Sequence, residues 1–175
     1  MVRALAMVTG VASAAVIFAP AHATERGAQL VNSFQTFCTP GPPDFAATDA
    51  KAAEMKLEVR RDMASQSPVA HTKSWRLTLP SGAYELVAAE AHGPKGDAGS
   101  CGIGAEDVDG DDIKQELVKA MNLGPPLQQS VSADGMQRLT SWKYGDDMTL
   151  FLADATPYKV PGMYLSLVRQ KNFNR

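Results

Sequence analysis

The chain lacks every short motif that would identify a reaction. It has no Gly-x-Ser-x-Gly elbow, no His-Glu-x-x-His zinc motif and no Cys-x-x-Cys pair. Its glycine-rich segment Gly93–Gly99 does not end in the Gly-Lys-Ser/Thr of a phosphate-binding loop, and we expect a mobile surface loop there. Because nothing marks a nucleophile, a metal site or a nucleotide site, we predict no catalytic residue, no metal and no cofactor.

A long basic run is also missing. The 17 Lys and Arg residues are outnumbered by 19 Asp and Glu residues, and the formal net charge is −2 at pH 7. Proteins that bind nucleic acids present a basic patch or stripe to the phosphates. We therefore expect no nucleic-acid partner.

What the chain does have at its start is the three-part pattern of a secretory signal peptide. Arg3 supplies a positive charge, the run Ala4–Ala19 is apolar, and the tripeptide Ala-His-Ala ends at Ala23. The apolar run is shorter than the roughly twenty residues of a membrane-spanning helix, and a retained anchor is the alternative. The pattern predicts a signal peptide over 1–23 and a single domain over 24–175. We expect the domain in the periplasm or the extracellular space, without stable membrane insertion after cleavage.

The only two cysteines, Cys38 and Cys101, lie in this predicted domain. An isolated pair in an oxidising compartment is most simply a disulfide. The bridge would close a loop of about 64 residues, for which the chain-entropy model gives roughly 4 kcal/mol of stabilisation. A nucleophilic thiolate is the alternative, with only His71 and His92 as imidazole partners.

Apolar residues at spacings of three and four predict three helices. The first runs from Glu25 to Cys38 and is stopped by the prolines that follow it. The second begins after Asp44, which would cap it. Its predicted buried stripe consists of Ala46, Ala50, Ala53 and Leu57. The third covers 111–123, where Asp112 and Gln115 resemble a capping box.

Apolar residues that alternate with polar ones predict the strands of an antiparallel sheet. A hairpin is predicted within 75–88 and a third strand over 101–105, whereas the polar segment 60–71 is predicted to be a loop. Four more strands are predicted at 127–132, 136–144, 148–153 and 163–168. This order predicts an α+β fold with six to seven strands, two to three helices on one face of the sheet, and one disulfide.

Acidic residues are densest just before the third predicted helix. Carboxylates at a helix start cap the free amides and complement the helix dipole, which is the simplest interpretation. The cluster exceeds the needs of capping, so an acidic patch for a basic protein partner and a partial EF-hand calcium loop are alternatives. The candidate residues for both are Asp107, Asp109, Asp111 and Glu116.

Aromatic side chains offer a second candidate surface for a partner. Trp75 alternates with leucines and is expected in the core. Trp142 shares its predicted face with a threonine and with Tyr144, which makes it the better candidate for an exposed binding aromatic; packing between sheet and helix is the favoured alternative. Tyr158 and Lys159 lie in a loop with two prolines that could insert into a partner.

Four short segments carry a resemblance to a known group of proteins. They are Phe34–Cys38 (FQTFC), Trp75–Leu77 (WRL), Gly82–Leu86 (GAYEL) and Ser100–Ile103 (SCGI). Over roughly 34–121 the chain resembles exported proteobacterial proteins of unknown function that share a Phe-x-x-x-Cys helix and a Cys-Gly strand start. The resemblance implies export, the disulfide and an α+β fold, and it implies no activity.

The sequence thus predicts a small, exported, non-catalytic protein that binds or inhibits a protein partner. An envelope structural or interaction protein is one alternative, and a large apolar patch outside the core would indicate it. A hydrolase with an unrecognised site is the other. Its sign would be a pocket that holds His71 or His92 beside a carboxylate with a shifted pKa.

Overall fold

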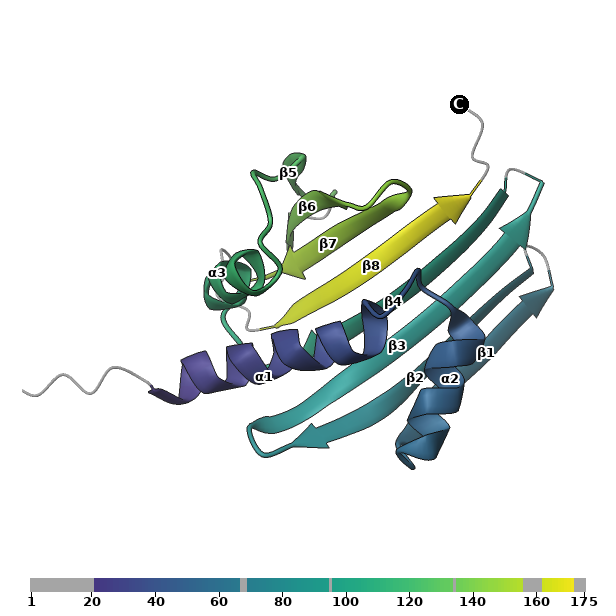
Figure 1. The fold of residues 1–175 in the computed structure, drawn as a ribbon, viewed down its shortest axis with the longest axis horizontal. Helices are drawn as coiled ribbons and strands as arrows, with labels where there is room; N and C mark the ends of the chain where they lie inside the picture. The colour runs from purple at the N-terminus through teal and green to yellow at the C-terminus, as the bar shows by residue number, and fades with distance from the viewer. Residues whose placement is uncertain (1–20, 67–68, 95, 134, 156–161, 172–175) are drawn as a thin grey trace, which may run out of the picture.

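The computed structural model describes residues 21–66, 69–94, 96–133, 135–155 and 162–171, which form one antiparallel sheet with a layer of helices on one face (Figure 1). The helices are α1 (Ala21–Cys38), α2 (Phe45–Glu54) and α3 (Gly110–Ala120). The strands are β1 (Glu58–Gln66), β2 (Val69–Leu79), β3 (Gly82–Gly93), β4 (Gly96–Ala105), β5 (Gln128–Val131), β6 (Arg138–Tyr144), β7 (Met148–Asp154) and β8 (Met163–Lys171). The predicted α+β class and the disulfide are confirmed, while the eight strands exceed the predicted six to seven.

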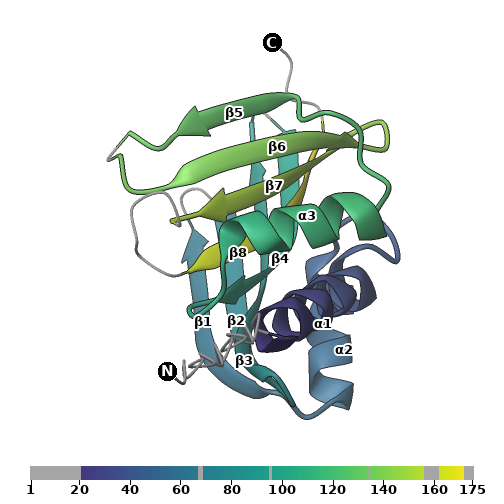
Figure 2. The same ribbon diagram turned by 90° about the vertical axis from the view of Figure 1, so that its left-hand side faces the viewer.

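Two four-stranded meanders make up the sheet. Its strand order is β1-β2-β3-β4-β8-β7-β6-β5, so the meanders β1–β4 and β5–β8 join where β4 pairs with β8. Helix α3 connects the two meanders along the chain. The sheet is strongly twisted, and in Figure 2 strands β5, β6 and β7 run nearly across the direction of β1 to β3. Among the described strands, β1 and β5 are the edge strands of the sheet.

Helix α1 lies across the sheet because its apolar side chains share one face. Leu30, Phe34 and Cys38 are spaced by four residues and are at most 2% exposed. They pack with inward-facing strand residues such as Trp75 and Leu165 in one core. The predicted first helix is confirmed, although it begins at Ala21. Residues 1–20 of the predicted signal peptide lie outside the described part of the chain.

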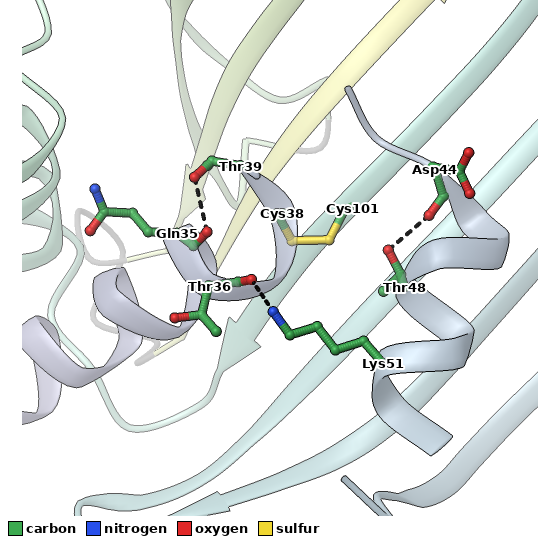
Figure 3. Close-up of a disulfide and its surroundings, with 8 residues drawn as sticks. All are labelled: Gln35, Thr36, Cys38, Thr39, Asp44, Thr48, Lys51 and Cys101. Atoms are coloured by element: carbon green, nitrogen blue, oxygen red, sulfur yellow. Dashed lines mark hydrogen bonds between the residues drawn. A yellow bond between two sulfur atoms is a disulfide. The ribbon is translucent and has the colours of Figure 1, made fainter. Parts of the chain in front are cut away.

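The disulfide joins the end of α1 to the middle of β4. Cys38 and Cys101 are 5.3 Å apart between their Cα atoms and 63 positions apart in the sequence. Figure 3 shows the bridge beside the contact of Lys51 on α2 with the carbonyl of Thr36 on α1, at 2.6 Å. The bridge and this hydrogen bond together hold both helices against the sheet. No described helix combines the length and the apolar character that a membrane crossing requires.

The predicted loop over 60–71 is wrong, because its described residues, 60–66 and 69–71, belong to the paired strands β1 and β2. All nine residues of β1 are exposed. A strand with no buried face has no reason to alternate apolar and polar residues, so it gives no signal in the sequence. The strand in excess of the predicted number is therefore the edge strand β1.

The predicted mobile loop over Gly93–Gly99 is also wrong. Gly93 pairs with Gly96, and most of the segment belongs to β3 and β4. A Cβ atom at Gly99 would lie 2.9 Å from the carbonyl oxygen of Pro43, in the connection between α1 and α2. Glycine stands here because another backbone lies against the strand, a requirement that does not show in the local pattern.

Helix α2 buries a different stripe from the predicted one. Phe45, Thr48 and Ala52 are buried, whereas the predicted Ala46, Ala50 and Ala53 are exposed. The large Phe45 ring decides the orientation, since it packs against the ring of His71 on β2 with 4.2 Å between centroids. The predicted cap is confirmed, because the carboxylate of Asp44 accepts a hydrogen bond from the amide of Ala47 at 2.8 Å.

Candidate functional site

The aromatic candidates do not form an exposed surface. Trp142 is 1% exposed, and Tyr144 is partly buried against the same core. On β6 both side chains project to the helical side of the sheet, since Trp142 is opposite the fully buried Leu150. The interpretation of Trp142 as an exposed binding aromatic is therefore wrong, and the alternative of packing between sheet and helix is confirmed. Tyr158 and Lys159 lie outside the described residues.

The acidic candidates take separate positions around the start of α3. Asp109 caps the helix by accepting hydrogen bonds from the amides of Asp111 and Asp112. Asp107 is exposed before the helix, and Glu116 is half-buried one turn and a half into it. Within the described part of the chain, no three His, Cys, Asp or Glu side chains are grouped as metal ligands would be. Capping of α3 thus explains the position of Asp109, in agreement with the simplest interpretation of the sequence.

Asp111 belongs to a network that the sequence analysis missed. Its carboxylate contacts Arg138 on β6, and the same guanidinium donates two hydrogen bonds of 3.1 Å to Asp154 on β7. The side chain of Asp154 is 0% exposed. Burial alone would lower the pKa of Arg138, but the hydrogen bonds that it donates to Asp154 and Asp111 raise it above its ordinary value. The guanidinium therefore stays charged and ties the start of α3 to the sheet.

A second group of charged side chains, made up of arginines, lies at one end of the sheet. An open depression of about 760 Å³ is lined by Arg26 from α1, by Arg60 and Arg61 from β1, and by Arg76 from β2. Neither Arg26 nor Arg61 forms an ion pair with a described residue. Arg60 and Arg76 lie 3.5 and 3.8 Å from the exposed carboxylate of Glu58, a surface geometry that contributes little.

Contacts between α1 and the turn from β2 to β3 fix Arg26 at the rim. Its guanidinium lies 5.6 Å from the centre of the Tyr84 ring. The Tyr84 hydroxyl donates to the carbonyl of Arg26 at 3.3 Å and is 2.6 Å from the hydroxyl of Ser81, which in turn donates to Gln29 at 2.6 Å. The Nε atom of Arg26 is buried and has no hydrogen-bond partner among the described residues. This arginine is thus positioned by the fold.

The opposite side of the depression is acidic and phenolic. Glu85, Glu106 and Asp107 line it together with Tyr164. Burial, and to a smaller extent the charge of Glu85, raises the pKa of Tyr164 to about 12, so its phenol is neutral at physiological pH. The depression therefore has a basic side on β1 and an acidic side at the ends of β3 and β4.

The two histidines lie elsewhere, each beside a carboxylate. His71 is 2.6 Å from Asp62, and His92 is 3.0 Å from Asp97. His92 lines a second depression of about 360 Å³ with Glu90 and Asp97. Both cysteines are in the disulfide, so the chain holds no free thiol for either imidazole to activate. The predicted sign of a hydrolase is thus present in part, because His92 lines a depression beside Asp97 and has a raised pKa, but its side chain is 51% exposed.

His92 is expected to titrate above the ordinary imidazole pKa of 6.5, because its hydrogen bond to Asp97 raises its pKa more than partial desolvation lowers it. The Asp97→Asn variant should return the midpoint toward 6.5, as measured by NMR of the imidazole protons. Any stabilisation from this pair is fully present below pH 6.5 and is lost as the pH rises through the folded-state pKa. A midpoint that is the same in both proteins would contradict the assignment.

Comparisons of this chain with protein-family models, with curated proteins and with solved structures each found no match.

Proposed function

We propose that this chain is an exported, non-catalytic binding domain, and that the arginine-lined depression receives an acidic protein partner. The proposal rests on a difference in ion pairing among the described arginines. Arg138 and Arg169 are held in ion pairs by aspartates. The other four line one depression, where Arg26 and Arg61 have no carboxylate partner within the described part of the chain.

Arginine suits such a site because its planar guanidinium binds carboxylates through two parallel hydrogen bonds. Arginines are also enriched among the residues that dominate binding at protein interfaces. The acidic side of the depression, with Glu85 and Glu106, restricts the attraction for a uniformly acidic ligand to the arginines of the basic side. A partner whose carboxylates meet β1 and whose neutral or basic groups meet β3 and β4 fits best.

Export is supported by the disulfide. Structural disulfides persist in oxidising compartments and are rare where thiols are kept reduced. Cys38 and Cys101 are 2% and 1% exposed, which fits a structural bridge within the core. The periplasm or the extracellular space is thus the proposed location, in agreement with the signal-peptide pattern in the first 23 residues.

Binding of poly-L-glutamate tests the site. Isothermal titration calorimetry at low salt should detect binding to the oxidised domain, and the double variant Arg60→Gln/Arg61→Gln should weaken it about fivefold, since exposed pairs each contribute up to about 1 kcal/mol. Binding should also weaken as salt is raised.

The matched control is Lys143→Gln, which removes an exposed positive charge from β6, far from β1 in the strand order. Poly-L-glutamate should bind this variant as it binds the native chain. Equal weakening by both variants would indicate a response to net charge and would count against the depression as the site.

A further inference from the structure

We propose that the acidic partner binds as an extended segment that pairs with β1 and extends the sheet by one strand. This inference rests on the proposed function and specifies its partner. Recognition by strand addition takes affinity from main-chain hydrogen bonds and specificity from alternate side chains. It requires a free, accessible strand edge beside the groups that select the partner.

Strand β1 meets this requirement and the other edge does not. β1 has nine residues, all exposed, and contains no proline. No described strand pairs with the outer side of β1, because among the described strands β1 pairs only with β2. The opposite edge, β5, has four residues and is separated by one residue from Pro125 and Pro126. A long unpaired edge is a template for another strand.

The side chains of β1 define the segment that fits. Arg61 is opposite Ser74 and Met63 is opposite Thr72, so both project to the face of the sheet away from the helices. Met63 is 51% exposed. An added strand would place an acidic residue beside Arg61 and an apolar residue, two positions along, beside Met63. The proposed partner therefore carries the pattern acidic-x-apolar, in either direction.

The charges of β1 favour such a partner over a second copy of this chain. Pairing two β1 strands over their full length, 58–66, places Asp62 opposite Asp62 across the two-fold axis. Like charges directly opposite each other are destabilising in antiparallel sheets. The irregular register between Val59 and Arg61 further disturbs a regular self-pairing. An acidic residue placed beside Arg61, which forms no ion pair with a described residue, avoids that pairing of like charges.

The test uses the blocked peptide Thr-Thr-Glu-Thr-Val-Thr-Thr as probe, with two matched peptides. One has the same sequence with N-methyl groups on alternate residues, which block main-chain pairing, and the other has Lys in place of Glu. Amide hydrogen exchange by NMR on the oxidised full domain should show new protection in β1 with the Glu probe. Binding of the N-methylated probe should be at least tenfold weaker, because several hydrogen bonds of about 1 kcal/mol each are lost.

The variant Arg61→Glu supplies the complementary arm. It should bind the Glu probe about fivefold more weakly and the Lys probe more tightly, which also shows that the variant is folded.

Equal binding of the N-methylated and the unmodified Glu probe would overturn strand addition and leave the anion site intact. Binding of poly-L-glutamate without binding of the Glu probe would also overturn strand addition and leave the anion site intact. Failure of poly-L-glutamate and of all three peptides would overturn both proposals. In the free domain, protection of the β1 amides that increases with protein concentration would indicate that β1 pairs with a second copy of the chain. That result would overturn this inference.

Discussion

Replacing both cysteines, as Cys38→Ala/Cys101→Ala, is expected to lower the free energy of unfolding by about 4 kcal/mol. The bridge connects positions 63 apart, so its loss returns the entropy of a long open loop to the unfolded chain. It also removes the covalent cross-link between α1 and β4. Urea denaturation of the oxidised native chain and of the double variant measures the difference.

The control for this prediction is Thr39→Ala, at the residue after Cys38. Its hydroxyl donates to the carbonyl of Gln35 at 2.9 Å, and it is partly buried at the same junction. We expect a loss of about 1 kcal/mol or less for this ordinary hydrogen bond. If the cysteine variant lost no more than the threonine variant, the bridge would not be a main source of stability in this domain.

Asp154→Ala is expected to cost about 3 kcal/mol or more, because it leaves the charge of Arg138 without its buried partner. The two groups are joined by two hydrogen bonds of 3.1 Å, and the carboxylate has no contact with solvent. Chemical denaturation reports the change, and loss of amide protection at the start of α3 should accompany it.

Asp111→Asn is the matched control, because this carboxylate contacts the same guanidinium but its side chain is 56% exposed. An exposed partner contributes about 1 kcal/mol or less. The close fit of Gly110 explains why the network cannot rearrange easily: a Cβ atom at this glycine would lie 2.4 Å from the Cβ atom of Asp154. Equal losses from Asp111→Asn and Asp154→Ala would contradict the role assigned to burial.

The sequence allowed a prediction of those elements that have one buried and one exposed face. Strand β7 alternates, and α3 carries Ile113 and Leu117 on one side, so their positions follow from local periodicity. The cysteine pair was predictable because only one pairing exists. Strand β1 was not, because an exposed edge strand has no apolar alternation to detect.

Alternation also cannot say which face of a strand the helices cover. Thr140 and Trp142 share a face, and the polar threonine suggested solvent there, yet Thr140 is 0% exposed. The arginine-lined depression escaped prediction for a related reason. Its arginines come from α1, β1 and β2, which are brought together only by the tertiary fold, so no basic run marks it in the sequence.

The order of strands gives the final segment a particular importance for assembly. The sheet is completed in its middle, where β8, the last strand of the chain, fills the place between β4 and β7. Until β8 arrives, both inner strands expose main-chain groups and the apolar side chains of Ile103 and Leu152 lack their neighbour Leu165. The two meanders therefore cannot become one hydrophobic unit during synthesis, and the disulfide, whose cysteines both precede β5, can close within the first meander while the second is still absent.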